Sequence, residues 1–245
     1  MYKNLERFIR EAKAVASAEE LFERFLSEAK KLGINLASYQ IVSKNLQRTE
    51  KAEEPIFNTF PKEWTDHYAK NKRFENDPLI ALSRAKGKPF HWYDVDKYTK
   101  LSAAEKTHIN ELKERGFRDG IAIPVFGPAG TMSFFSLGSD DHSLKFTEED
   151  MQLLQYMCQT LHQRYSELNK SDEQKNDAPA PKLSARERDV LQWVASGKSN
   201  SVIADILGIS EHTVDTLLRR SYKKLGVSNR ISAVLKGISY GIIQP

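Results

Sequence analysis

Aromatic and acidic side chains in the first half of the chain have a spacing that suits a small-molecule site. Trp64 and Tyr68 are four residues apart, which places both on one face of a helix. Asp77 stands directly before Pro78, and Trp92 lies further along the chain. Apolar walls with a few placed donors and acceptors are typical of ligand pockets. The same residues also fit structural roles, because aromatic side chains fill cores and an Asp before Pro is a good helix cap.

A different chemistry is concentrated in the last quarter of the chain. Residues 182–245 hold ten basic and five acidic side chains, a net charge of +5, although the whole chain carries only +4. A helix over 200–207, a turn over 208–210 and a helix from Glu211 have helix-turn-helix spacing, in which the second helix enters a major groove. The outward residues expected to contact double-stranded DNA are Asp215, Thr216, Arg219, Arg220 and Lys223.

Local signals define the elements that must position these residues. A Ser or Thr followed three residues later by an acid marks a helix start, and it occurs at Ser17, Ser102, Thr147 and Ser184. Three runs rich in β-branched, aromatic or other apolar residues predict strands over 37–42, 121–126 and 132–137. The stretch 120–139 carries no charge, but turn residues at 127–130 divide it. It therefore predicts a buried hairpin and no membrane span.

These elements predict an α+β fold with two domains. An N-terminal α-β-α sandwich with a mostly antiparallel sheet occupies residues 1–168, and a small all-α helix-turn-helix domain occupies residues 183–245. Residues 169–182 lack large apolar side chains and end in alternating Ala and Pro, so they predict a linker.

Several function classes are excluded by what the sequence lacks. The single cysteine, Cys158, rules out an internal disulfide framework and indicates a reducing cytoplasm. The six histidines have no metal-ligand spacing, and neither a phosphate loop nor a nucleophile elbow is present. We therefore expect no enzyme, no metal, no cofactor and no membrane partner. The strand and helix order also differs from that of a receiver domain of a two-component response regulator.

The carboxy-terminal segment resembles the LuxR-type helix-turn-helix signature over residues 183–234. The resemblance is carried by Leu183-Ser-x-Arg-Glu187, Ala195-x-Gly197-Lys198-Ser199, Ile209-Ser210-x-x-Thr213-Val214 and Lys224-Leu225-Gly226-Val227-x-Asn229-Arg230. It adds Lys198 and Ser199 to the expected DNA-binding residues. Many members have a His at the position of Leu217 and an acid at that of Val202, so the base preference is not transferable from a relative.

The amino-terminal residues resemble the autoinducer-binding domain of LuxR-type quorum-sensing regulators, over about residues 20–165. The resemblance rests on Trp64-x-x-x-Tyr68, Asp77-Pro78, Trp92 and Gly120. It implies that Trp64 donates to the lactone carbonyl of an N-acyl-homoserine lactone and that Asp77 accepts the amide N–H. It also implies that Tyr68 and Trp92 pack on the ligand and that Ser136 lies near the amide.

Phe60 departs from the family pattern. Several members have a tyrosine there, whose hydroxyl bonds the acyl carbonyl, and phenylalanine has no such donor. Three alternatives follow: Ser136 compensates, the acyl chain differs, or the chain answers another signal or none. A helix over about 148–168 carries an apolar stripe that fits either the partner in a homodimer or packing within its own domain. We expect a homodimer, and a two-fold dimer is expected to bind an inverted-repeat DNA site.

Overall fold

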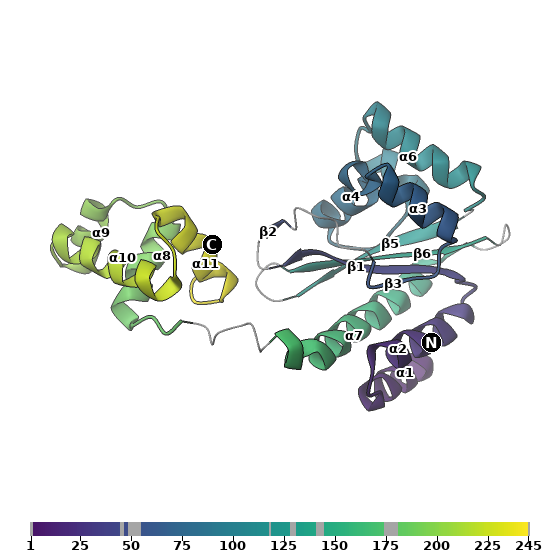
Figure 1. Cartoon of the computed structure of the whole chain (residues 1–245), viewed down its shortest axis with the longest axis horizontal. Coiled ribbons are helices and arrows are strands. Elements are labelled where there is room, and N and C mark those ends of the chain that lie inside the picture. Colours follow the sequence, from purple (N-terminus) through teal and green to yellow (C-terminus); the bar gives the residue numbers. More distant parts are fainter. Residues whose placement is uncertain are drawn as a thin grey trace. The chain divides into compact units, whose positions relative to one another are not determined.

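The computed structural model describes residues 2–44, 47–48, 55–117, 119–127, 131–140, 145–173 and 181–244. Within these residues the chain forms two compact units, one built around a β-sheet and one entirely helical (Figure 1). The fold class therefore matches the prediction of an α+β domain followed by a helical one. The predicted turn at 127–130 falls mostly outside the described residues.

The sheet of the first unit is antiparallel at the four pairings whose register is defined. Its order is β2-β1-β6-β5-β4, and β3 pairs with β1 beside this path. The long central strands are β1 (Leu36–Lys44), β5 (Asp119–Phe126) and β6 (Met132–Ser139), which confirms the three predicted strands. The short strands are β2 (Gln47–Arg48), β3 (Phe57–Asn58) and β4 (Phe90–His91). The β5–β6 register pairs Gly120 with Gly138.

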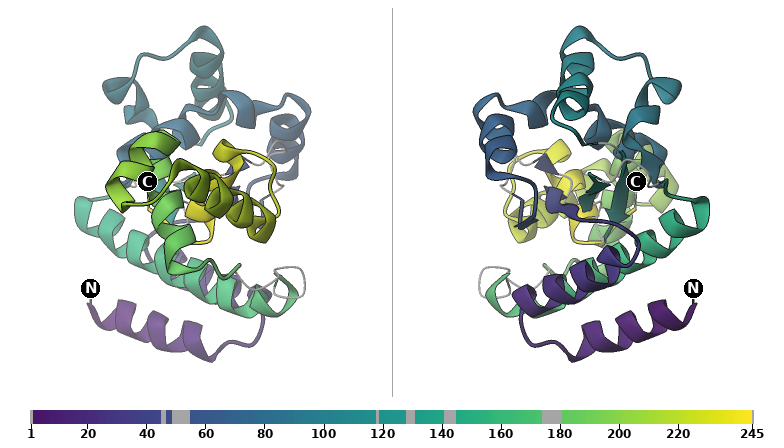
Figure 2. Two further views of the ribbon diagram at one scale, coloured as in Figure 1. Left: turned by 90° about the vertical axis from the view of Figure 1, so that its left-hand side faces the viewer. Right: turned by 90° about the vertical axis from the view of Figure 1, so that its right-hand side faces the viewer.

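Helices cover both faces of this sheet, as Figures 1 and 2 show. On one face lie α1 (Tyr2–Ala14), α2 (Ala18–Lys30) and α7 (Glu148–Glu173). The other face carries α3 (Lys62–Lys70), η1 (Arg73–Asn76), α4 (Pro78–Lys86), η2 (Trp92–Asp94), α5 (Val95–Tyr98) and α6 (Ala103–Glu114). The unit is thus the expected α-β-α sandwich.

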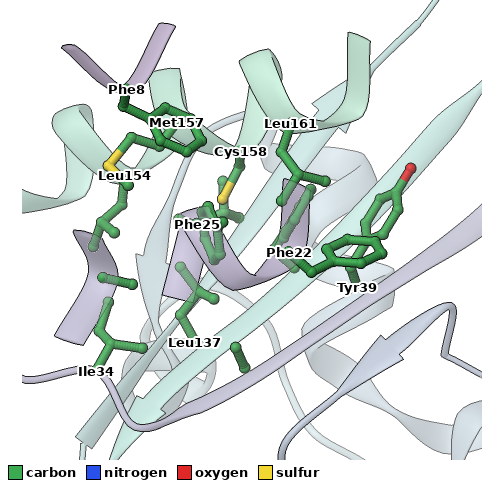
Figure 3. Close-up of a cluster of buried hydrophobic side chains, with 14 of the residues drawn as sticks. Phe8, Phe22, Phe25, Ile34, Tyr39, Leu137, Leu154, Met157, Cys158 and Leu161 are labelled. Atoms are coloured by element: carbon green, nitrogen blue, oxygen red, sulfur yellow. The ribbon is translucent and has the colours of Figure 1, made fainter. Parts of the chain in front are cut away.

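Strand alternation assigns side chains to two separate cores. The first core lies under α1, α2 and α7, and it takes alternate strand residues such as Ile121 and Ile123 of β5. Figure 3 shows two further strand residues of this core, Tyr39 and Leu137. The second core lies under α3, α4 and α6, and it takes the intervening residues Ala122 and Phe134. Its other buried members are Leu36, Trp64, Leu79, Leu82, Phe90, Trp92, Val95, Leu101, Ile109, Leu112 and Phe117.

The predicted helix starts are present in the structure. Ser102 and Ser184 each form a complete capping box with the glutamate three residues later, and Ser17 caps α2. The end of α7 differs from the expectation, because the helix continues to Glu173 and so passes both Leu168 and the predicted linker start at Asn169. A segment without large apolar residues can still extend a helix that is already nucleated.

The second unit consists of α8 (Ala185–Ala195), α9 (Asn200–Leu207), α10 (Glu211–Leu225) and α11 (Arg230–Ser239). Gly208 ends α9 in the left-handed conformation with φ 63°, and the Ser210 side chain caps α10 by accepting from the Thr213 N–H. A glycine at this position avoids the steric cost that a Cβ would incur. Val190, Val214 and Leu218 are buried where α8, α9 and α10 meet.

No helix within the described ranges combines the length and the apolar character needed to cross a membrane.

Candidate functional site

Asp77 is the polar centre of the second core. Its side chain caps α4, where Pro78 takes the first helical position and Asp77 Oδ1 accepts from the Leu79 N–H at 2.8 Å. The sequence-based alternative of a helix cap is therefore correct. The other oxygen, Oδ2, accepts from the Tyr68 hydroxyl at 2.8 Å, and the whole residue is only 8% exposed. A carboxylate has about four acceptor sites, so these two bonds leave room for a further donor.

The surroundings keep Asp77 ionised. Burial raises the pKa of Asp77, but the neighbouring His108, the Tyr68 hydroxyl and the Leu79 N–H together outweigh burial and hold that pKa below its usual value. Burial and the adjacent carboxylate both raise the pKa of Tyr68 well above its usual value, so Tyr68 remains a neutral donor. Asp77 is thus a buried, acceptor-only group.

His108 on α6 completes this polar group, although the sequence gives no spacing signal for it. Its Nε2 lies 3.6 Å from Asp77 Oδ2, and the residue is 1% exposed. Its ring also contacts the rings of Trp64 and Tyr68, with centroid distances of 5.9 and 5.6 Å. His108 therefore joins three of the residues that the sequence indicated.

Trp64 lies among rings on the same face. It is 6% exposed and packs edge-on against Phe117 with centroids 5.5 Å apart. The Arg115 guanidinium stands 5.4 Å from the ring centroid, in the range of a cation–π contact. Tyr68 is one helical turn further along α3, with its ring centroid 6.0 Å from that of Trp64. The predicted helical face is therefore correct.

Trp92 is fully buried against the sheet. Its ring lies over the paired glycines of β5 and β6, where an added Cβ at Gly120 or Gly138 would come within 2.4 or 2.3 Å of the ring. This contact explains why the sequence needs a glycine at 120. It shows the same need at 138, which no sequence motif indicated. The Trp92 indole N–H has no hydrogen-bond partner among the described residues.

The remaining two predicted ligand residues share this face. Phe60 packs near Trp92 and Phe117, at centroid distances of 6.1 and 5.4 Å. Ser136 is registered opposite Ala122 on β5, and alternation directs both to the side of the second core. The structure thus gathers Phe60, Trp64, Tyr68, Asp77, Trp92 and Ser136 on one face of the sheet.

A charged cluster joins the helices around this core. Glu111 on α6 accepts from the Arg73 guanidinium, and its carboxylate lies 3.3 Å from His67 Nε2 on α3. The His67 ring in turn stacks on Trp64. These contacts fix α3, η1 and α6 to each other beside the aromatic rings.

A surface hollow of about 250 Å³ lies elsewhere, between α1 and α2. It is lined by Arg7, Glu11, Arg24, Ser27, Glu28 and Lys31. Glu28 at its base is paired with both Arg7 and Lys31, at 2.8 and 2.7 Å. These charged walls do not suit an apolar ligand chain.

The second unit presents the predicted recognition helix, α10, with its basic residues outward. Arg219, Arg220 and Lys223 are exposed, and Asp215 and Thr216 are half-buried. Arg219 Nε pairs with Asp215 Oδ2 at 2.9 Å, an exposed contact one turn apart. The first turn of α10 is also exposed, and its residues Glu211 and His212 were not among the predicted DNA-binding residues.

Lys198 and Ser199 lie at the start of α9, where both are exposed. The Ser199 hydroxyl caps this helix by accepting from the Val202 N–H. The Arg230 guanidinium of α11 donates to Asn200 Oδ1 at 2.8 Å and to the Lys198 carbonyl, so it anchors this helix start. Lys224 pairs with the buried Glu187 at 2.6 Å and is therefore structural.

Two family models match the chain, one for each unit. A model described as "Autoinducer binding domain" matches residues 17–165, and one described as "Bacterial regulatory proteins, luxR family" matches residues 181–236. The chain is 30% identical over 231 residues to the transcriptional activator protein AhyR of Aeromonas hydrophila. That alignment covers 92% of this chain and 85% of AhyR.

Two solved structures share the fold over the whole chain. Escherichia coli SdiA matches with a TM-score of 0.70 at 20% identity, covering 100% of this chain and 99% of that one. SdiA in complex with octanoyl-rac-glycerol matches with a TM-score of 0.65 at 20% identity, covering 100% of this chain and 97% of that one. At this identity the similarity supports the fold.

Proposed function

Because the chain belongs to the LuxR family of bacterial regulatory proteins, with an autoinducer-binding domain before its helix-turn-helix domain, we propose that it senses an N-acyl-homoserine lactone. The signal would bind at the second core and be read out as binding of a homodimer to an inverted-repeat DNA site. Proteins of this family are transcriptional regulators and not enzymes. We expect this one to act in quorum sensing, in the cytoplasm, where bacterial DNA lies.

The main support is the buried polar chemistry of the second core. Ser83 Oγ, Trp92 Nε1 and His108 Nδ1 are buried there without partners among the described residues, and Asp77 has acceptor capacity left. Leaving a buried polar atom unpaired costs about 1 to 3 kcal/mol. A ligand that bonds to several of these atoms would recover that free energy and so favour the ligand-bound state.

The proposed contacts follow from donor and acceptor types. The Trp64 indole can only donate, which suits the lactone carbonyl, and the ionised Asp77 can only accept, which suits the amide N–H. Trp64 and Phe117 contact each other in this structure. A bound acyl chain would lie between such rings of the second core and replace their contacts with each other. Tyr68 and Trp92 would then pack against the ligand.

The replacement of Asp77 by Asn tests the ligand site. We expect Asp77→Asn to weaken binding of N-octanoyl-homoserine lactone by about 1.5 to 3 kcal/mol, because a charge-assisted hydrogen bond is lost. The side chain can still accept from the Leu79 N–H, so α4 should remain capped. Isothermal titration calorimetry measures the affinity, and thermal unfolding checks the fold. An unchanged affinity would mean that Asp77 is only a helix cap.

A lactone is not the only candidate signal, because Phe60 lacks the hydroxyl that bonds the acyl carbonyl in several relatives. A signal of another head group, or ligand-independent folding, is the second candidate. The ligand panel therefore includes octanoyl-rac-glycerol, which SdiA binds in one solved structure. A thermal shift with the glycerol ester and none with lactones would favour the other signal.

Gel-shift titration tests the DNA readout. A two-fold dimer contacts two half-sites, so a full inverted repeat should bind far more tightly than a half-site duplex in the presence of ligand. Equal affinity for both duplexes would exclude dimeric reading. Mass spectrometry of small molecules that copurify with the protein would identify the signal directly.

A further inference from the structure

His108 occupies the centre of the candidate ligand site, and neither the sequence motifs nor the family match assigns a role to it. It is 1% exposed, so its two ring nitrogens can bond only to groups within the second core. Its ring lies beside those of Trp64 and Tyr68, and Asp77 faces one of its nitrogens. A ligand bound between Trp64 and Asp77 would therefore meet this ring.

The two nitrogens of His108 have different environments. Nε2 lies 3.6 Å from the ionised carboxylate of Asp77, which can only accept, so the ring proton belongs on Nε2. In the neutral ring Nδ1 then carries a lone pair and is an acceptor. Nδ1 is buried and has no hydrogen-bond partner among the described residues.

Three donors around Asp77 and His108 are already engaged. The Tyr68 hydroxyl donates to Asp77, and the Arg73 guanidinium donates to Glu111. The Leu79 N–H also donates to Asp77. The unused acceptor of His108 is therefore not matched by these three donors, and the unpaired Ser83 hydroxyl and Trp92 indole N–H do not bond to it either.

We propose that His108 is a specificity-determining residue of the ligand site, which selects a ligand with a second hydrogen-bond donor. This inference rests on the proposed function, in which Asp77 takes the amide N–H of the signal. His108 Nδ1 accepts from a hydroxyl close to that amide. The preferred ligand class is a hydroxylated acyl signal, because an unsubstituted acyl-homoserine lactone has one donor only.

Three lactones of equal chain length test the proposal on the full-length protein. N-octanoyl-homoserine lactone has the amide donor alone, the 3-oxo derivative adds an acceptor, and the 3-hydroxy derivative adds a donor. We expect the 3-hydroxy lactone to bind about tenfold more tightly than the other two, which corresponds to a hydrogen bond of about 1.4 kcal/mol. Calorimetric dissociation constants measure this preference.

Two substitutions separate recognition from packing. His108→Phe keeps an aromatic ring against Trp64 and Tyr68 but has no acceptor. The tenfold preference should therefore disappear, and the three lactones should bind this variant about equally. His108→Asn keeps an acceptor near the Nδ1 position, so it should retain part of the preference. Thermal unfolding shows whether each variant folds, and the ratio of the three affinities within one variant cancels a general loss of stability.

The outcomes distinguish this proposal from the proposed function. If the three lactones bind the natural protein equally, or if His108→Phe keeps the tenfold preference, His108 does not select the ligand. If none of the three lactones binds, the lactone-sensing function itself fails, and the role of His108 fails with it.

Discussion

The two faces of the β-sheet both carry aromatic-rich cores, but the cores differ in how far their buried polar groups are hydrogen-bonded. In the first core, His162 Nδ1 lies 2.8 Å from the Tyr39 hydroxyl and 3.1 Å from the Ser133 hydroxyl. Arg164 there has one unpartnered nitrogen, but its other two bond to Glu167 and to the Val15 carbonyl. In the second core, Ser83 Oγ and the Trp92 indole N–H have no partner among the described residues.

This difference separates a structural core from a candidate binding core. A polar group in a structural core is normally hydrogen-bonded, because an unpaired buried group costs free energy. The first core follows this rule through contacts within the chain. The second core collects buried polar atoms that have no partner among the described residues, and a bound molecule could satisfy them.

The largest expected effect is a loss of stability, without a loss of ligand affinity, when a residue of the first core is truncated. Leu154 on α7 is fully buried in the first core, so Leu154→Ala should destabilise the first unit by about 2 to 5 kcal/mol through a cavity. The affinity of the folded protein for its ligand should stay unchanged, because the residue lies across the sheet from Asp77. Hydrogen exchange of β5 and β6 in the full chain measures stability, and calorimetry measures affinity. A loss of affinity comparable to that of Asp77→Asn would show that the two faces are coupled.

A matched pair of serine substitutions sharpens the comparison. Ser133 and Ser83 are both fully buried, but only Ser133 has a hydrogen-bond partner, His162. Ser133→Ala should cost about 1 kcal/mol of stability, whereas Ser83→Ala should be neutral or stabilising without ligand. Urea unfolding of the two variants checks the difference. Equal losses would mean that Ser83 is also satisfied, which would weaken the case for a binding core.

The smallest effect is an acid sensitivity of the first core. Burial lowers the pKa of His162 from its ordinary value of 6.5. As pH falls, His162 is therefore protonated at a higher pH in the unfolded chain than in the folded chain. The free energy of unfolding has its full value above about pH 6.5 and decreases as pH falls below it. Because one proton is involved, the free energy of unfolding can change by at most about 1.4 kcal/mol per pH unit.

The substitution His162→Gln provides the control, since it removes the titrating group but keeps hydrogen-bonding capacity. Its stability should fall less steeply than that of the natural chain between pH 6.5 and 5, an interval chosen below the ordinary pKa. Parallel pH profiles for the two proteins would assign the acid sensitivity to other groups.

The sequence predicted the elements well where neighbouring residues decide them. Ser184 and Glu187 define a helix start within four positions, and Gly208 with Ser210 defines the turn before α10. Strand positions followed from apolar runs bounded by turn residues. The end of α7 was less predictable, because helix ends depend on weak local preferences that an existing helix overrides.

By itself, the sequence determined the elements, because they depend on residue types at short spacing. It also indicated the family and, through that resemblance, the six candidate ligand residues. Only the tertiary structure decided how these residues meet. It brought His108 from α6 against Asp77 and Trp64, and it laid Trp92 over Gly120 and Gly138. It also decided which buried polar atoms are left without partners. Contacts between residues far apart in the chain depend on how whole layers pack, and no local spacing encodes that arrangement.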